Sequence, residues 1–569
     1  MTSPAKKNLQ WTPPEIMLAI LFLLAPLYYH PNLGGEGLRI PHNITIWLVA
    51  TIFIAYSFHK VLKARQYVIP KYFWMIAAFP VLATLSGFIA GVEQPLKWLF
   101  RLLFIWGGLA FLFALFQARL SQARIDRLLY LVVLSALTFA IVGMMQIWLK
   151  LGMPYLLPKN PDGIPGSFFQ QINNQATYQV TAIIIAIYLS MRPWLRAGHI
   201  VKRITLIVAA GLATYIVAVS GSRIGALTLM ISLLLVLLVI WQNWRKDRLV
   251  LAVLAAVVVG VFAGNLTGSD KLVDKTEALQ AGYSAEARLG MYSISLGLIA
   301  ESPIVGHGIG SFPPKWQYAK PDFYAEHPDA KLPKDFVNHP HNELIQWLVE
   351  GGLLAFAGMV LVVVGVVLAG IKTSPNRAAL YAAMLLPIAL HTQVELPFYM
   401  SALHWLLFMG LLFVALHHQT RQKIIGLTVS ATNLLKLSSI SVAVVLVLFY
   451  AHSIRSNWDF VAYYQGKQMQ NPLPYAYQNP YLGEQARWID LSAMMYSSIE
   501  QNIPENVRYY IAWGESLKQF RPDVSLYTKL VDAYEFLGDK ANYCSSANEG
   551  LSIYPANARL QNAVEFCKY

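Results

Sequence analysis

Charged side chains are scarce in this sequence. Asp, Glu, Lys and Arg make up 13% of the 569 residues, whereas soluble globular proteins contain about 25%. Apolar runs fill the difference, and they occur at 16–29, 44–58, 72–89, 128–149, 205–219, 224–241, 249–263, 353–371 and 438–450. Several approach the roughly 20 residues that a helix needs to cross a ~30 Å hydrocarbon core. Because lipid offers the backbone no hydrogen bonds, these runs must be helices, and an ordinary soluble protein is excluded.

Basic residues are concentrated in every second connection between the runs. The basic clusters lie at 6–7, 60–71, 119–127, 192–203, 245–248, 372–377 and 421–436. Such clusters mark the cytoplasmic side of a membrane. The pattern predicts an all-α polytopic membrane protein with about thirteen transmembrane helices, its N-terminus in the cytoplasm and its C-terminus in the periplasm.

The net charge of +14 does not indicate a nucleic-acid partner. Residues 457–569 contain nine Lys or Arg and twelve Asp or Glu, so the rest of the chain carries +17. That excess flanks the apolar runs on the cytoplasmic side, where topology explains it. We therefore expect membrane lipid and no nucleic acid as a partner.

Cysteine is almost absent. Cys544 and Cys567 are the two in the sequence, and both lie in the part expected to face the periplasm. An oxidising compartment favours a disulfide between them, and the alternative is two independent buried thiols.

Four regions follow from these patterns. Residues 1–264 hold the first nine spans, 265–345 form a large polar periplasmic loop, 346–455 hold four more spans, and 456–569 form a soluble tail. A loop as long as 265–345 is usually functional or disordered. In the tail, Leu530, Ala533, Tyr534, Gly538 and Pro555 resemble a tetratricopeptide repeat, which predicts a TPR-like helical domain that binds or braces.

The stretch from His339 to Gly352, HPHNELIQWLVEGG, is the most informative. It predicts two histidines and an Asn at the start of a helix that enters the membrane at Glu343. A neutral histidine there can take a proton from a hydroxyl. Two alternatives remain open: interfacial histidines that only anchor the helix, and a zinc site that also uses His307 and His327.

Arginines on the expected periplasmic side need a reason. Arg223 lies in a very short turn between two spans, and Arg288 lies in the polar loop. The planar guanidinium matches phosphate oxygens bidentately, so the pair suits a pyrophosphate at headgroup depth. The alternative is a salt bridge, for instance to Glu286 or Glu301.

Three further segments contain candidate residues. Residues 167–175, SFFQQINNQ, form an amide-rich loop with Gln171 and Asn173, which suits sugar hydroxyls or helix capping. His391 and Glu395 lie near the outer end of a span, where ionisable groups are functional candidates by default. Residues 302–312 form a Gly-rich turn that we interpret as a backbone shape element.

Together these motifs resemble the O-antigen ligase/Wzy-like superfamily, and most closely its PglL-type bacterial protein O-oligosaccharyltransferases. The similarity covers nearly the whole chain. It rests on 339–352, on Arg288 followed by the Gly-rich turn 303–312, on Ser220–Arg223, on Gln171–Ala176 and on His391–Pro397. Ile172 stands where the family usually has Pro, and Leu396 replaces an aromatic residue.

The resemblance implies an inverting, metal-independent transfer that needs no cofactor. An undecaprenyl-diphosphate-linked oligosaccharide would be moved en bloc to a Ser or Thr hydroxyl of a periplasmic protein such as a pilin. The roles it implies are the following: His341 as base with His339 and Asn342 beside it, Arg223 and Arg288 on the pyrophosphate, Gln171, Asn173, His391 and Glu395 orienting glycan or acceptor, and Glu350 holding the helix end.

Two other functions compete with this one. An O-antigen ligase or a Wzy-type polymerase would differ only in the acceptor, and the soluble tail favours a protein acceptor. A transporter for the lipid-linked glycan should carry ionisable groups near the bilayer midplane and internal repeats. The candidate groups instead gather at the outer face, and the sequence shows no repeated halves.

Overall fold

The computed structural model describes residues 10–150, 152–153, 155–158, 163–241, 247–280, 285–467 and 472–568. Nearly all of the regular structure is helical. The first part contains α1 (Pro13–Ala19), continued by π- and 3₁₀-helical turns to Leu27, then α2 (Pro41–Ala64), α3 (Phe73–Ala90), α4 (Pro95–Gln117), α5 (Gln122–Trp148), α6 (Ile172–Ser190), α7 (Pro193–Arg196), α8 (Ile200–Val219), α9 (Arg223–Ile240) and α10 (Arg248–Gln280).

The second part contains α11 (Ala285–Glu301), α12 (Phe312–Tyr318), α13 (Lys320–Glu326), α14 (Glu343–Ile371), α15 (Pro375–His391), α16 (Pro397–Met400), α17 (Ala402–Leu416) and α18 (Val429–Tyr464). The tail contains α19 (Pro474–Gln478), α20 (Gly483–Glu500), α21 (Pro504–Lys518), α22 (Val524–Leu537), α23 (Lys540–Ile553) and α24 (Ala558–Phe566). Strands β1 (Gln66–Pro70) and β2 (Thr420–Ile424) pair antiparallel. The borders expected at 264 and 456 fall inside α10 and α18.

Nine of the described helices are long and apolar enough to cross a membrane, and they are α2, α3, α4, α5, α8, α9, α10, α14 and α18. Residues 13–27 and α17 are shorter apolar helices. The chain is therefore an all-α, multi-pass membrane protein. A total of thirteen spans stays a prediction.

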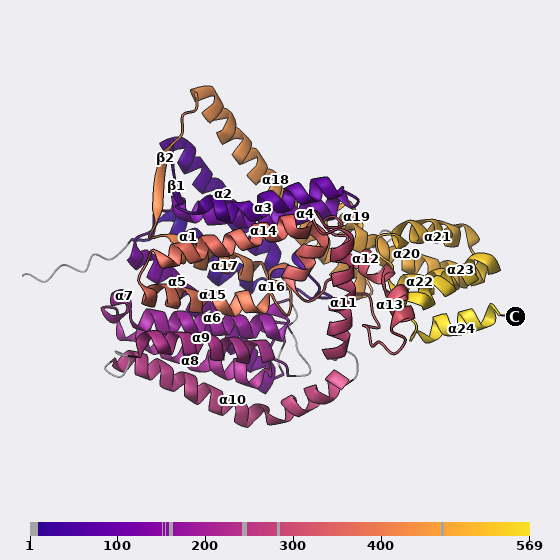
Figure 1. Cartoon of the computed structure of the whole chain (residues 1–569), viewed down its shortest axis with the longest axis horizontal. Coiled ribbons are helices and arrows are strands. Elements are labelled where there is room, and N and C mark those ends of the chain that lie inside the picture. The colour runs from indigo at the N-terminus through magenta and orange to yellow at the C-terminus, as the bar shows by residue number, and fades with distance from the viewer. Residues whose placement is uncertain are drawn as a thin grey trace, which may run out of the picture.

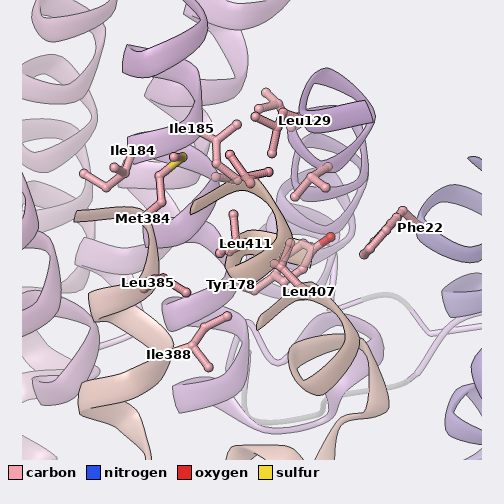
Figure 2. Packing of buried hydrophobic residues seen from close by; sticks show 14 of the residues in the cluster. Phe22, Leu129, Tyr178, Ile184, Ile185, Met384, Leu385, Ile388, Leu407 and Leu411 are labelled. Atoms are coloured by element: carbon pink, nitrogen blue, oxygen red, sulfur yellow. The ribbon is translucent and has the colours of Figure 1, made fainter. Parts of the chain in front are cut away.

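Helix α6 lies at the centre of the bundle. Its residues from Asn174 to Ser190 are all buried, and it packs against α5, α8, α9 and α15. Figure 2 shows Tyr178, Ile184 and Ile185 of α6 among apolar side chains of α5, α15 and α17. A helix enclosed on all sides needs packing surface around its whole circumference, and this one offers mostly Ile, Ala, Val and Thr.

The two ends of the bundle differ in composition. Strands β1 and β2 and helix α7 lie at one end of the bundle, which we call the basic end (Figure 1). The polar segment that contains α11–α13, which we call the insert, and the tail lie at the other end, the insert end. At the basic end, Glu15 pairs with Arg124 and Arg127, and Asp126 pairs with Arg192 at 3.0 Å. The basic connections thus gather away from the insert end, as the charge pattern requires.

The tail is a row of antiparallel helices, each packed on the next from α20 to α24. Cys544 and Cys567 are joined in a disulfide bond, with 5.8 Å between their Cα atoms. The tail also contacts the insert, because the Tyr318 hydroxyl donates to the Lys518 carbonyl at 3.0 Å. It is therefore attached to the membrane bundle both through α18 and through the insert.

Candidate active site

A break in α14 anchors the Gly-rich turn of the insert. Gly352 has φ +58° and ψ −163°, which interrupts the helix. The freed carbonyls of Val349 and Glu350 accept from the amides of His307 and Gly308 at 2.9 and 3.0 Å. A Cβ on Gly352 would lie 2.5 Å from the backbone of Ile304, and one on Gly306 would lie 2.5 Å from that of Glu350. The interpretation of 302–312 as a shape element therefore has a steric basis.

The start of α14 positions the two histidines. The Asn342 side chain caps the helix by accepting from the amides of Leu344 and Ile345, at 2.9 and 3.1 Å. Its Nδ2 donates to the Gln393 carbonyl at 3.0 Å. Just before this cap His341 has φ +53°, and its amide donates to His339 Nδ1 at 3.2 Å. The imidazole centroids lie 4.5 Å apart.

Both imidazoles are neutral at physiological pH. Burial lowers the pKa of His339 to about 4, and the nearby charge of Arg101 acts in the same direction. Burial also lowers the pKa of His341 to about 3, assisted by His339 and Arg288. Neutral imidazoles can accept a proton or a hydrogen bond.

The four histidines of the zinc alternative do not come together. His307 Nε2 lies 2.8 Å from the Leu298 carbonyl, and His327 stacks on Phe323, while His339 and His341 form their own pair. Among the described residues, no three His, Cys, Asp or Glu side chains are arranged as metal ligands.

Arg288 lies close to His341 and to Glu395, since its charge acts on both groups. The acids expected as its salt-bridge partners are engaged elsewhere. Glu286 pairs with Lys331 at 3.1 Å, and Glu301 lies 3.7 Å from His307. In the described part of the chain Arg288 forms no ion pair, and its half-buried side chain lies near both His341 and Glu395.

The amide loop holds Glu395. Gln171 and Asn173 donate to its carboxylate at 3.1 and 3.3 Å, and burial raises the pKa of that carboxyl. Gln171 also caps α6 by accepting from the Asn174 amide at 2.6 Å. This is the helix-capping role that the sequence analysis offered as the alternative to binding sugar hydroxyls. Asn173 accepts in addition from the Ser222 hydroxyl at 2.8 Å. Both amides are thus used inside the protein.

The position of Arg223 depends on the same network of hydrogen bonds. Ser222 is the N-cap of α9 and accepts from the Gly225 amide, which places Arg223 at the first helical position, at the insert end. Its side chain is exposed. No carboxylate of the described residues pairs with it.

The structure does not bring His391 to this cluster. It is fully buried in the helix packing, where its Nδ1 lies 2.9 Å from the Thr177 hydroxyl and its ring faces His404. The prediction that it orients the glycan or the acceptor therefore has no support from the geometry.

Arg101, a basic residue of α4, lies near His339 and was missed by the sequence analysis. Arg101 stacks on Tyr399 at 4.2 Å and lies 3.9 Å from the carboxylate of Glu350. Tyr399 in turn donates to Glu343 at 2.8 Å. The argument that selected Arg223, a cation at the end of a span that the charge pattern predicts to be periplasmic, applies equally to Lys97 and Arg101. Glu350 is fully buried beside the break in α14.

Fold and site together define a multi-pass membrane protein with neutral histidines and arginines at one end of its bundle. Residues 207–360 match the O-antigen ligase family. Residues 379–566 match the C-terminal region of virulence-factor membrane-bound polymerases. The chain belongs to the O-antigen ligase/Wzy-like superfamily of glycan-transferring membrane enzymes. No curated protein sequence matches it.

Proposed function

We propose that the protein is an O-linked oligosaccharyltransferase of the bacterial inner membrane. It moves a glycan en bloc from an undecaprenyl-diphosphate carrier to a Ser or Thr hydroxyl of a periplasmic protein such as a pilin. The observation that carries this proposal is the neutral pair His339 and His341, with Arg101 near His339 and Arg288 near His341.

The chemistry requires a base and a site for a growing negative charge. The acceptor oxygen attacks the anomeric carbon from the face opposite the diphosphate, so the configuration inverts. The hydroxyl proton passes to His341, and the bond between the anomeric carbon and the phosphate oxygen breaks. Charge then grows on the leaving diphosphate, where Arg288 and Arg223 stabilise it through bidentate hydrogen bonds. The leaving group is already activated, so we expect no metal or cofactor to be needed.

Glu395 and the two amides act by position. Because Gln171 and Asn173 donate to Glu395, they tie the start of α6 to the loop after α15. Asn342 ties the start of α14 to the same loop through Gln393. We propose that this bonded frame sets the distance from Arg288 to His341, and that Glu350 holds the end of the first segment of α14.

The orientation completes the proposal. The basic connections lie at the end away from the site, so the N-terminus is cytoplasmic, and the insert and tail face the periplasm. A disulfide in the tail suits that compartment. The second candidate is an O-antigen ligase acting on lipopolysaccharide core. A helical tail after the last span resembles the protein-transferring branch of the superfamily, and this resemblance favours the protein acceptor.

The test is co-expression with a pathway for a lipid-linked glycan and candidate pilins, followed by intact-mass measurement of the pilin. We expect a pilin heavier by one whole glycan. Unmodified pilin beside extended lipopolysaccharide would instead establish the ligase.

A further inference from the structure

A pocket of about 750 Å³ lies at the basic end of the bundle, opposite the candidate active site. Small-molecule sites typically have volumes of roughly 300–1,000 Å³. Residues of α7, α8, α9, α10 and α15 line it. Helix α10 packs on α8, and α15 packs on α9, so the pocket lies where these two packed pairs of helices meet.

The polar part of the lining is positively charged. It contains three arginines, Arg196 of α7, Arg203 of α8 and Arg248 of α10, and one carboxylate, that of Asp247. The carboxylate is already engaged, because Arg196 pairs with it and the Leu249 amide donates to it at 3.1 Å. In the described part of the chain neither Arg203 nor Arg248 forms an ion pair. The lining therefore has an excess of positive charge.

The guanidinium of Arg203 is fixed at the pocket with one donor unused. Its Nη2 donates to the carbonyls of Arg196 and Gly198, which ties α8 to the segment before it. Its Nε is buried and meets no hydrogen-bond acceptor among the described residues. Leaving a buried donor without an acceptor costs free energy. An anion in the pocket would supply that acceptor, and Arg248 is exposed and can contact the same anion.

The pocket lies at the depth of lipid headgroups. Trp241 directly follows the lining residue Ile240 and is 63% exposed, and Trp is enriched where membranes meet water. The apolar part of the lining includes Val239 and Ile240 of α9 and Val250 of α10, and both helices are long and apolar enough to cross a membrane. The pocket thus offers arginines to a phosphate and apolar side chains to the glycerol and acyl groups attached to it.

We infer that this pocket binds the headgroup of an anionic phospholipid, with its phosphate at Arg203 and Arg248. The planar guanidinium matches phosphate oxygens, and basic pockets between membrane helices suit anionic headgroups. A zwitterionic headgroup brings an ammonium group to the arginines and is disfavoured. The bound lipid joins the α8–α10 pair to the α9–α15 pair. This site is separate from glycan transfer and does not depend on the proposed function.

The test measures binding to the full chain, stripped of lipid in detergent, by native mass spectrometry. The probes are phosphatidylglycerol, phosphatidylethanolamine with the same acyl chains, and the deacylated headgroup glycerophosphoglycerol. We expect phosphatidylglycerol to bind about tenfold more tightly than phosphatidylethanolamine, because two arginines favour the anionic headgroup. Equal binding of the two lipids would overturn the inference. Equal binding of the deacylated headgroup would show a site for a soluble phosphodiester and would overturn it as well.

Matched substitutions locate the lipid. Val239→Trp fills the pocket and should weaken binding of phosphatidylglycerol about tenfold, since an overfilled site loses its fit. Leu238→Trp is its control, because Leu238 is the neighbouring residue, is 67% exposed and does not line the pocket. Arg248→Gln should weaken binding about fivefold. Its control is Arg377→Gln, since Arg377 is an exposed arginine of α15 outside the lining.

A melting curve in detergent separates lost binding from lost folding. Without lipid, Arg248→Gln should melt like the unsubstituted chain, because Arg248 is exposed. Added phosphatidylglycerol should raise the melting temperature of the unsubstituted chain and of Arg377→Gln, and it should raise that of Arg248→Gln less. If each substituted chain binds phosphatidylglycerol as its control does, the lipid lies elsewhere and the inference is refuted.

Discussion

His341 and His339 are adjacent but not equivalent. His341 has φ +53° and lies near Arg288, while His339 accepts a hydrogen bond from the His341 amide and lines a cavity bordered by α2, α4 and α18. If His341 is the base, His341→Ala should lower the transfer rate by about 10²–10⁴, with the protein still inserted. His339→Ala should cost less, because it removes only a support.

The pH dependence provides an independent check on this assignment. Folded-state pKa values of about 4 and about 3 keep both rings neutral at higher pH. Loss of the base by protonation should therefore not lower the rate between about pH 8 and about pH 5.

Equal and mild losses in the two Ala variants, measured as initial rates on a purified acceptor, would mean that the pair is an interfacial anchor.

Replacing Arg288 or Arg223 by Lys tests whether the guanidinium makes a bidentate contact or acts only as a point charge. Arg288→Lys and Arg223→Lys keep the charge but lose the planar fork, so each should reduce transfer by about tenfold or more. The loss should be equal for two different acceptor proteins, because all acceptors share the donor's leaving group. A defect confined to one acceptor would show that these arginines contact the protein.

Some of the site could be predicted from the sequence and some could not. Asn342 as a helix cap and the break at Gly352 agree with local residue types, and Arg223 and Arg288 could be selected because they are exceptions to the expected charge bias. The engagement of Gln171 and Asn173 by Glu395 joins residues more than two hundred positions apart. The inward direction of His391 depends on the rotation of α15 in the bundle. Neither is encoded locally.

The break in α14 and the turn at Gly306 fit together without space for a side chain. Gly352→Ala adds a Cβ 2.5 Å from the Ile304 backbone and forces a residue other than Gly to a positive φ, which costs about 1–3 kcal/mol. We expect a lower melting temperature, and we also expect a loss of transfer, because the break positions Glu350 and holds the Gly-rich turn of the insert. Melting followed by tryptophan fluorescence in detergent measures the first effect.

Gly297→Ala is the matched control for that substitution. Gly297 lies within α11, and an added Cβ meets nothing within 4 Å, so Ala should be neutral or slightly stabilising there. If Gly352→Ala melts and transfers like Gly297→Ala, the break is not a structural requirement.

The division into bundle, insert and tail stays a prediction from charge and hydropathy, and two of its borders, at 264 and 456, fall inside α10 and α18. The contacts between these regions could not be predicted from the sequence. Lys320 of the insert is fully buried and lies 4.4 Å from the ring of Tyr554 in the tail. Arg521 of the tail lies 5.7 Å from the ring of Phe336. Such contacts between distant segments have no periodic signature. They favour bracing over recruitment as the role of the tail.

Removing the tail tests that choice. The cut belongs after Gln465, because α18 continues to Tyr464 and a cut at Ser456 would shorten a membrane helix. Truncation exposes Lys320 and removes Arg521 and Tyr481, which line the same cavity as His339 and Glu350. If the tail braces the insert and the donor site, transfer to two unrelated acceptors should fall by the same factor, about tenfold or more for a lost positioning element.

Arg288→Lys, assayed in parallel, provides the pattern of a donor-side defect. A recruiting tail would instead spare one acceptor and abolish transfer to the other, and that result would contradict bracing. Insertion of the truncated chain, checked by its amount in isolated membranes, ensures that a uniform loss is not a loss of protein.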